Sequence, residues 1–349
     1  PRTKQRRGFH RKSRDREMQR TSLSGVKGVR GDPSGGLPVE GSPPVGPTPP
    51  GSGRGVSIGG GFWGRFLQNR RAVIGLALLL MFYLLAILAP WLASYGVNEQ
   101  SLADRLKPPS GTHWMGTDRY GRDILSRALW AGQISQSVGL FSMGISIGVG
   151  IVIGALAGFY SGWIDHLLSR LTETIITFPT YFIMILIVAL FGASFLNLIL
   201  VIGLTSWPIT ARVVRAEFLS LKERPFVESA LATGAGKLRV MVRHILPNVV
   251  PVIVVAATLR VAYVILAEAG LSYLGFGIQP PTPSWGNMVA EGRTFLRTAW
   301  WITVFPGLFI FLSVMAYNLI GDGLRDAFDP RMQAPGEATS KPPLGRSNV

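Results

Sequence analysis

The sequence predicts an all-α membrane protein with six transmembrane helices and both chain ends on the cytoplasmic side. The chain has 349 residues and is 48% hydrophobic, and its apolar residues gather in runs of about 20, the length that crosses a bilayer core. Lys and Arg concentrate in the segments that would share one side of the membrane. A polar, basic block from Glu223 to Asn248 separates two apolar runs and has the pattern of two short helices.

Residues 1–61 are predicted to be a disordered cytoplasmic tail, basic at first and then rich in Gly and Pro. They contain almost no large apolar side chains, so burial cannot offset the entropy of ordering them. The net charge of +16 would suit nucleic acid, but fifteen of the 35 Lys and Arg residues precede the first span, where anionic lipid attracts them. No aromatic residues interleave the basic run as a stacking platform requires. The bilayer is therefore the expected partner, and RNA binding by the tail is the minor alternative.

The transmembrane domain is predicted over residues 62–332, followed by a disordered tail over 333–349. The six spans are apolar runs with few charges; their approximate ranges are 72–93, 134–159, 173–191, 195–214, 249–271 and 299–320. With this assignment about 27 Lys and Arg lie in cytoplasmic segments and about seven in external ones. This asymmetry predicts that the N-terminus and the C-terminus are both inside.

Small residues and prolines predict how the spans pack and bend. Glycines recur every four positions in the second span, which lets another helix approach closely, although a loosely packed helix is the alternative. These glycines are Gly144 and Gly148, then Gly150, Gly154 and Gly158. Three further spans contain a proline that removes a backbone hydrogen bond and is predicted to bend its helix: Pro179, Pro208 and Pro306.

Arg260 and Glu268 are the clearest ionisable residues within a span, and we predict them as candidate pathway residues. A charge in hydrocarbon is costly, so each should face protein or a water-filled path. Glu268 lies near the outer end of its span, so reaching the interface is the alternative for it. The chain has no cysteine, and its four histidines are scattered, so neither a disulfide framework nor a metal site is expected.

The loop after the first span carries acids and arginines in alternation: Asp118 and Asp123 with Arg119, Arg122 and Arg127. This pattern predicts salt bridges within one folded piece. A hydrolase with paired carboxylates is the alternative, but nothing nearby shapes a pocket for it.

A phosphate-binding loop is not expected either. The segment GAGK at 234–237 has Leu238 where that motif needs Ser or Thr, and Leu231 where it needs the first glycine. We therefore predict that the chain is not an enzyme and binds no ATP or magnesium itself.

The basic block, residues 223–247, is predicted to be an ordered helical elbow. Arg224-Pro225 suits a helix start, because proline fits the first turn. The stretch 234–236, Gly-Ala-Gly, breaks the helix and permits a turn. A second helix is expected from Lys237 until Pro247 begins the next span. An ordinary basic loop is the alternative.

The elbow resembles the Glu-Ala-Ala (EAA) loop of permease subunits of bacterial ATP-binding-cassette importers. That pattern is Glu-Ala-Ala, three residues, Gly, nine residues, then Ile-x-Leu-Pro. The matching residues here are Glu228, Ser229 and Ala230, then Gly234, then Leu246 and Pro247. Ser229 replaces the second residue of the triad, and His244 stands where the pattern has Ile. In that family the elbow is the coupling helix that sits in a groove of the ATPase.

Five segments together resemble the dipeptide/oligopeptide/nickel permease subfamily, and within it the C-type permease subunit. They occur in the family's order: 116–127, 194–215, the elbow, 266–288 and 319–332. The resemblance covers about 62–332 and implies the type I importer permease fold in a bacterial inner membrane.

The resemblance also implies the partners and the activity. The partners are a homologous B-type permease subunit, two ATPase subunits that hold ATP and magnesium, and an extracytoplasmic binding protein. The implied activity is import of dipeptides, oligopeptides or similar solutes, with a nickel permease as the alternative. Two other function classes remain: a secondary transporter, which usually shows inverted repeats that this sequence lacks, and a membrane anchor for the basic tail.

Overall fold

The computed structural model describes residues 62–328, and the predicted tails, 1–61 and 333–349, lie outside them. Over the described range the secondary structure is helical, and its one extended pairing is an isolated bridge between Thr117 and Asp123. Five of these helices are long and apolar enough to cross a membrane, or up to six spans if a bent pair is one. The structure thus confirms the all-α class predicted from the sequence.

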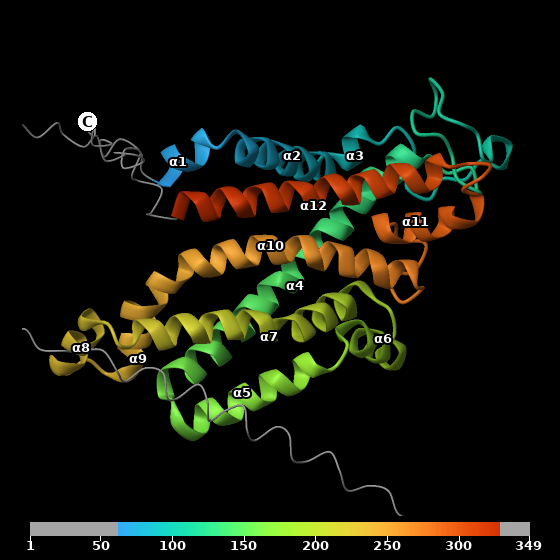
Figure 1. Ribbon diagram of the computed structural model, residues 1–349. Helices are drawn as coiled ribbons and strands as arrows, with labels where there is room; N and C mark the ends of the chain where they lie inside the picture. The colour runs from blue at the N-terminus through green and yellow to red at the C-terminus, as the bar shows by residue number, and fades with distance from the viewer. Residues whose placement is uncertain (1–61, 329–349) are drawn as a thin grey trace, which may run out of the picture. The chain divides into compact units, whose positions relative to one another are not determined.

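The first helices pack against the last one. Asn69 separates α1 (Phe62–Gln68) from α2 (Arg70–Ile87) and caps α2, because its side-chain oxygen accepts hydrogen bonds from two backbone N–H groups of the first turn. The short α3 (Ala89–Leu92) follows. Helix α2 lies along α12 (Trp301–Phe328), as Figure 1 shows.

Helix α4 (Ile124–Tyr160) is the longest, with 37 residues, and it runs obliquely across α7 and α10 (Figure 1). It begins at Ile124 and not at residue 134, where the predicted span begins. Asp123 caps the helix by accepting a hydrogen bond from the backbone N–H of Ser126 at 2.7 Å. The prediction missed this start because Arg127 makes the first turns look polar, although its side chain is buried among acids.

The five glycines of α4 that the sequence singled out divide into two groups. Three of them lie at the contact with α7 (Phe195–Leu221), where a Cβ atom would stand 2.5–2.6 Å from atoms of α7; these are Gly150, Gly154 and Gly158. A Cβ atom on Gly144 or Gly148 would meet no described atom within 4 Å. The backbones of α4 and α7 therefore approach closely along these three glycines, and also at Gly203 of α7, where a Cβ atom would lie 3.0 Å from the backbone oxygen of Ser142.

Replacing Gly154 with valine should lower the thermal stability of the purified protein. The added Cβ would stand 2.5 Å from the backbone oxygen of Ala211, which cannot rotate away. Overpacking of this kind costs about 1–3 kcal/mol or more. Gly144→Val is the matched control on the same helix and should melt close to wild type in detergent. Equal melting temperatures for the two variants would show that the α4–α7 contact tolerates the extra volume.

The segment after α4 forms two helices rather than one straight span. Helix α5 (Gly162–Thr177) and α6 (Thr180–Phe191) meet at an angle of 84°. Pro179 lies between them, where its missing N–H and fixed φ end one helix and start the next. The predicted single span over 173–191 therefore differs from the structure, which starts the first helix at Gly162 and breaks it at the proline.

The fifth span continues the second helix of the elbow without a gap. The elbow consists of α8 (Pro225–Ala232) and α9 (Lys237–Arg239), and a π-helical turn η2 (Val240–Ile245) leads directly into α10 (Leu246–Tyr273). The sequence predicted that Pro247 begins the next span, and α10 does begin there, with Pro247 tolerated in its first turn.

The two ends of the helix bundle differ. One end, here called the elbow end, carries α8 and α9 at the same side as α1 (Figure 1). The other, here called the loop end, carries the loop between α3 and α4, with the 3-10 turn η1 (Leu102–Asp104), and also α11 (Trp285–Gly292) and η3 (Arg293–Phe295).

Candidate coupling elbow and pathway residues

The elbow is an ordered helix–turn–helix closed by backbone hydrogen bonds. Helix α8 begins with Pro225 in its first turn and ends at Ala232, with Thr233 as its C-cap. Gly234 follows with φ +84°, the left-handed region that favours glycine. Its N–H donates to Leu231 O at 3.0 Å, and the next N–H donates to Ala230 O at 3.1 Å, the bond pair of a Schellman helix end. The turn thus requires the glycine that the sequence pattern singled out.

Val227 anchors the elbow to the bundle. It is the one buried residue of α8, with 0% of its surface exposed. It packs in a cluster with residues of η2, α7 and α10, among them Val240 and Ile245. The sequence did not single out Val227, because a helix of eight residues is too short to show a repeated apolar face.

The residues matched to the family pattern divide between the surface and the base of the elbow. Glu228, Ser229 and Gly234 are exposed, and Ala230 is half-buried. Leu246 packs against the cluster beneath the elbow, and the neighbouring Pro247 is exposed at the start of α10. The structure therefore brings the first four together on the elbow and places Leu246 and Pro247 where the elbow joins its span.

The exposed face of the elbow is both apolar and basic. Phe226, Leu231 and Leu238 are 41%, 43% and 70% exposed. Beside them a shallow hollow surrounds the glycine turn and includes two arginines; its lining residues are Thr233, Gly234, Ala235, Arg239, Arg243 and His244. Exposed apolar side chains gathered with charges are typical of a protein-binding surface.

Arg260 lies half-buried on α10 without an acidic partner. Its guanidinium stands over the Tyr263 ring, 4.4 Å from the centroid, a favourable cation–π contact. Within residues 62–328 no carboxylate lies within 4.0 Å of it, and its Nε atom is buried without a hydrogen-bond acceptor. Arg260 is therefore a partly desolvated cation that has no counter-charge among the described residues.

Glu268, the second candidate pathway residue, is enclosed by protein. Its carboxyl group is fully buried and accepts hydrogen bonds from Ser272 at 2.7 Å and Ser135 at 3.2 Å. The Ser135 hydroxyl also accepts the backbone N–H of Trp285 at 3.2 Å. Glu268 therefore joins α4, α10 and α11 at the loop end, and its side chain does not reach an open face of this chain.

The loop end is held by a buried ion network. Arg122 Nε lies 2.5 Å from Asp118 Oδ2, and Arg122 Nη2 lies 2.7 Å from Glu291 Oε2 of α11. Arg127 lies 3.9 Å and 3.8 Å from the same two acids. The alternating charges thus form salt bridges within the loop, as the sequence suggested, and they also fix α11, which the sequence did not indicate. Within residues 62–328, no three His, Asp or Glu side chains form a metal-binding group.

Comparisons with known proteins match most of the chain. Residues 150–334 match the family described as binding-protein-dependent transport system inner membrane component. Residues 57–109 match the N-terminal transmembrane domain of oligopeptide transport permease C.

The match with individual relatives extends over nearly the whole length of each relative. A dipeptide transport system permease protein of Alkalihalophilus pseudofirmus is 39% identical over 76% of this chain and 88% of the relative. A glutathione transport system permease protein of Shigella flexneri serotype 5b is 44% identical over 78% and 90%. The corresponding protein of an Escherichia coli O6 strain is 42% identical over the same shares.

Proposed function

Because this chain belongs to the family of binding-protein-dependent transport system inner membrane components, we propose that it forms half of the pathway of an ATP-driven importer for dipeptides, oligopeptides or similar solutes. It is a multi-pass inner-membrane permease of the C type and not an enzyme, since ATP hydrolysis in such importers occurs in separate subunits. The peptide substrate is supported by the dipeptide and glutathione permeases among its relatives.

The elbow is the part of this chain that docks on an ATPase subunit. The observation that carries this assignment is its ordered turn: Gly234 with φ +84° between two helices, in an exposed position at the end of the bundle. A shapeless loop would not keep Phe226 and Leu231 exposed beside arginines while Val227 anchors it. The assembly also contains a homologous B-type permease, two ATPases that bind ATP and magnesium, and an extracytoplasmic binding protein.

In this assembly the elbow moves with the ATPase beneath it. When ATP binding closes the two ATPases, the docked elbows approach each other and the spans open toward the outside; hydrolysis returns them. Arg260 is assigned to the pathway face, because a half-buried cation without a described carboxylate partner suits an anionic group that passes only transiently. Glu268 serves the loop end by joining three helices.

Six spans with both ends in the cytoplasm predict a specific labelling pattern. Single cysteines can be introduced freely because the chain has none. In whole cells, Thr112→Cys and Thr282→Cys should react with a membrane-impermeant thiol reagent, since both positions lie at the loop end. Lys222→Cys lies beside the elbow and should react only after the cells are opened. The reverse pattern would overturn this orientation.

The proposed function is tested with the purified chain and the proteins that accompany it. The chain should copurify with ATPase subunits, and the reconstituted complex should import a radiolabelled dipeptide only with ATP and the binding protein. A secondary transporter would instead import the peptide with an ion gradient and without ATP. An isolated membrane anchor would do neither.

A further inference from the structure

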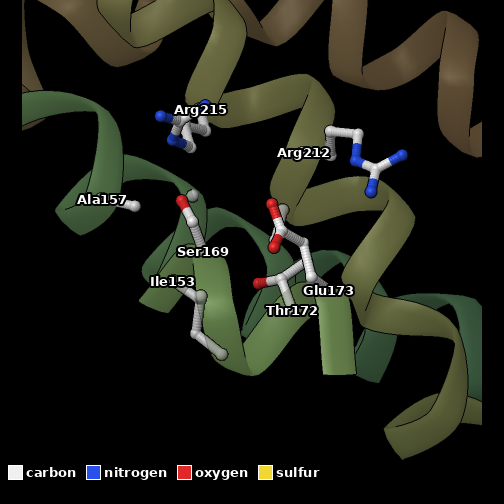
Figure 2. Close-up of a pocket in the computed structure, with 9 residues that line it drawn as sticks. Ile153, Ala157, Ser169, Thr172, Glu173, Arg212 and Arg215 are labelled. Atoms are coloured by element: carbon white, nitrogen blue, oxygen red, sulfur yellow. The ribbon is translucent and has the colours of Figure 1, made fainter. Parts of the chain in front are cut away.

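A polar cavity lies between α5, α7 and α4, nearer to the elbow end than to the loop end. Figure 2 shows Glu173 of α5 and Arg212 of α7 on facing helices, with Ser169 and Arg215 beside them. The floor consists of small side chains of α4 and α7, including Gly154 and Ala211. The cavity measures about 50 Å³, room for a few water molecules or one charged end group rather than a whole peptide, because one water molecule needs about 10–15 Å³ of such volume.

The charges at this cavity lie about two to three helical turns from the elbow-side ends of their helices. A rise of about 1.5 Å per residue puts Arg212 about 13 Å from the Leu221 end of α7. Glu173 is about 16 Å from the Gly162 end of α5. Both side chains are exposed in this chain, and lipid at that depth would make exposed charges costly. They therefore face water at the cytoplasmic end of a path or the partner permease.

Arg212 and Glu173, the two charged residues at the rim, are not neutralised by strong ion pairs within this chain. The neighbouring Arg215 is neutralised, since it donates to both carboxylate oxygens of Asp165 at 2.6 and 2.8 Å. Arg212, by contrast, has no carboxylate within 4.0 Å among the described residues. Glu173 has only a 3.8 Å contact with Arg170, whose side chain is 84% exposed, and such exposed pairs hold weakly.

The hydroxyl groups inside the cavity favour a ligand group that donates hydrogen bonds. The Ser169 hydroxyl donates to Asp165 at 2.9 Å, and the Thr172 hydroxyl donates to Leu168 O at 2.7 Å. Their hydrogens are used, so they offer lone pairs to the cavity. An ammonium group brings three donors and a positive charge, which matches these lone pairs and the Glu173 carboxylate.

We propose that this cavity is a station for the charged ends of a peptide in transit: the peptide ammonium lies against Glu173, Ser169 and Thr172, and its carboxylate against Arg212. A free peptide carries both charges at neutral pH, so one acid and one arginine at the same rim fit it. The inference rests on the proposed function, because it presumes that peptides pass along this face.

The test uses the complete reconstituted complex with its binding protein and dialanine as the substrate. Glu173→Gln and Arg212→Gln should each lower dialanine uptake about tenfold or more, the loss expected for one charge-assisted hydrogen bond. Arg170→Gln, on the same helix but outside the cavity, is the control and should stay within about twofold of wild type, as expected for an exposed charge. The ATPase activity stimulated by the loaded binding protein should persist in all three variants.

A second measurement detects occupancy directly and does not depend on these variants. Ser169→Cys puts a single thiol in the cavity, and saturating dialanine during turnover should slow its reaction with a thiol reagent. Dialanine amide lacks the carboxylate, so its uptake should fall in Glu173→Gln and not in Arg212→Gln.

Three outcomes would overturn the station. Normal dialanine uptake in both cavity variants would remove it. Unprotected Ser169→Cys, together with loss of the B-type permease from the variant complexes, would show that the charges pair with that subunit instead. If the wild-type complex neither imports dialanine nor shows stimulated ATPase activity, the proposed function on which the station rests would be refuted instead.

Discussion

Replacing Gly234 with valine should abolish substrate uptake while leaving the chain in the membrane. The residue adopts φ +84°, a region that a β-branched side chain avoids at a cost of roughly 1–3 kcal/mol. A Cβ atom there would meet no described atom within 4 Å, so the damage comes from the backbone of the turn and not from packing. The turn should reorganise, and the ATPase should no longer respond to the loaded binding protein. The measurement is substrate-stimulated ATPase activity and uptake in proteoliposomes.

Gly236→Val is the matched control for this change. Gly236 lies in the same turn and also has open space around it, but its φ is −62°, which valine accepts. It should therefore keep most of the uptake. Normal stimulation in Gly234→Val, or equal loss in both variants, would mean that the glycine conformation does not determine coupling.

Glu228→Lys tests the same surface through its charge. Glu228 is exposed in the first turn of α8 and forms no salt bridge within the described part of the chain. Its reversal should therefore not disturb folding, whereas like charges facing each other across a basic ATPase groove cost several kcal/mol. We expect loss of ATPase copurification or of stimulation. Arg297→Ala, exposed at the loop end, is the control and should behave as wild type.

Replacing Arg122 with alanine should strongly destabilise the loop end. Its side chain is 4% exposed and holds Asp118 at 2.5 Å and Glu291 at 2.7 Å. Removing one member of a buried ion network leaves the others charged and uncompensated, at a cost of about 3–5 kcal/mol. The melting temperature of the purified protein should fall more than in any surface variant, and α11 should become accessible to proteases.

Arg119→Ala is the control, because Arg119 is exposed and its guanidinium only covers the Tyr120 ring at 4.6 Å. A double-mutant cycle with Glu291→Gln isolates the contact: the two changes together should cost clearly less than the sum of each alone. Additive losses would show that Arg122 and Glu291 contribute independently.

The sequence was sufficient for the fold class and for the elbow. Runs of apolar residues indicate spans whatever the tertiary contacts, because hydrocarbon permits little else. The helix–turn–helix of the elbow could also be predicted, since Pro225 and Gly234 determine the local backbone conformation by their own restrictions. Both signals are local, which is why they survive without knowledge of the packing.

The contacts between distant segments could not be predicted in this way. Arg122 and Glu291 are far apart in the chain, and nothing near either residue indicates the other. Glu268 looked like a residue near the interface, yet Ser135 from another helix encloses it. The 84° angle at Pro179 also exceeds what a single proline dictates, because the neighbouring helices decide where the second segment lies.

The length of α4 gives it a mechanical role. Its 37 residues contain no proline and extend over about 55 Å, so this single helix connects the two ends of the bundle. Three glycines pack its C-terminal half closely against α7 beside the elbow, and the ion network holds its N-terminal end. A rigid tilt of α4 at its contact with α7 would therefore displace the opposite end, and α11 would move with it through the contacts of Arg127.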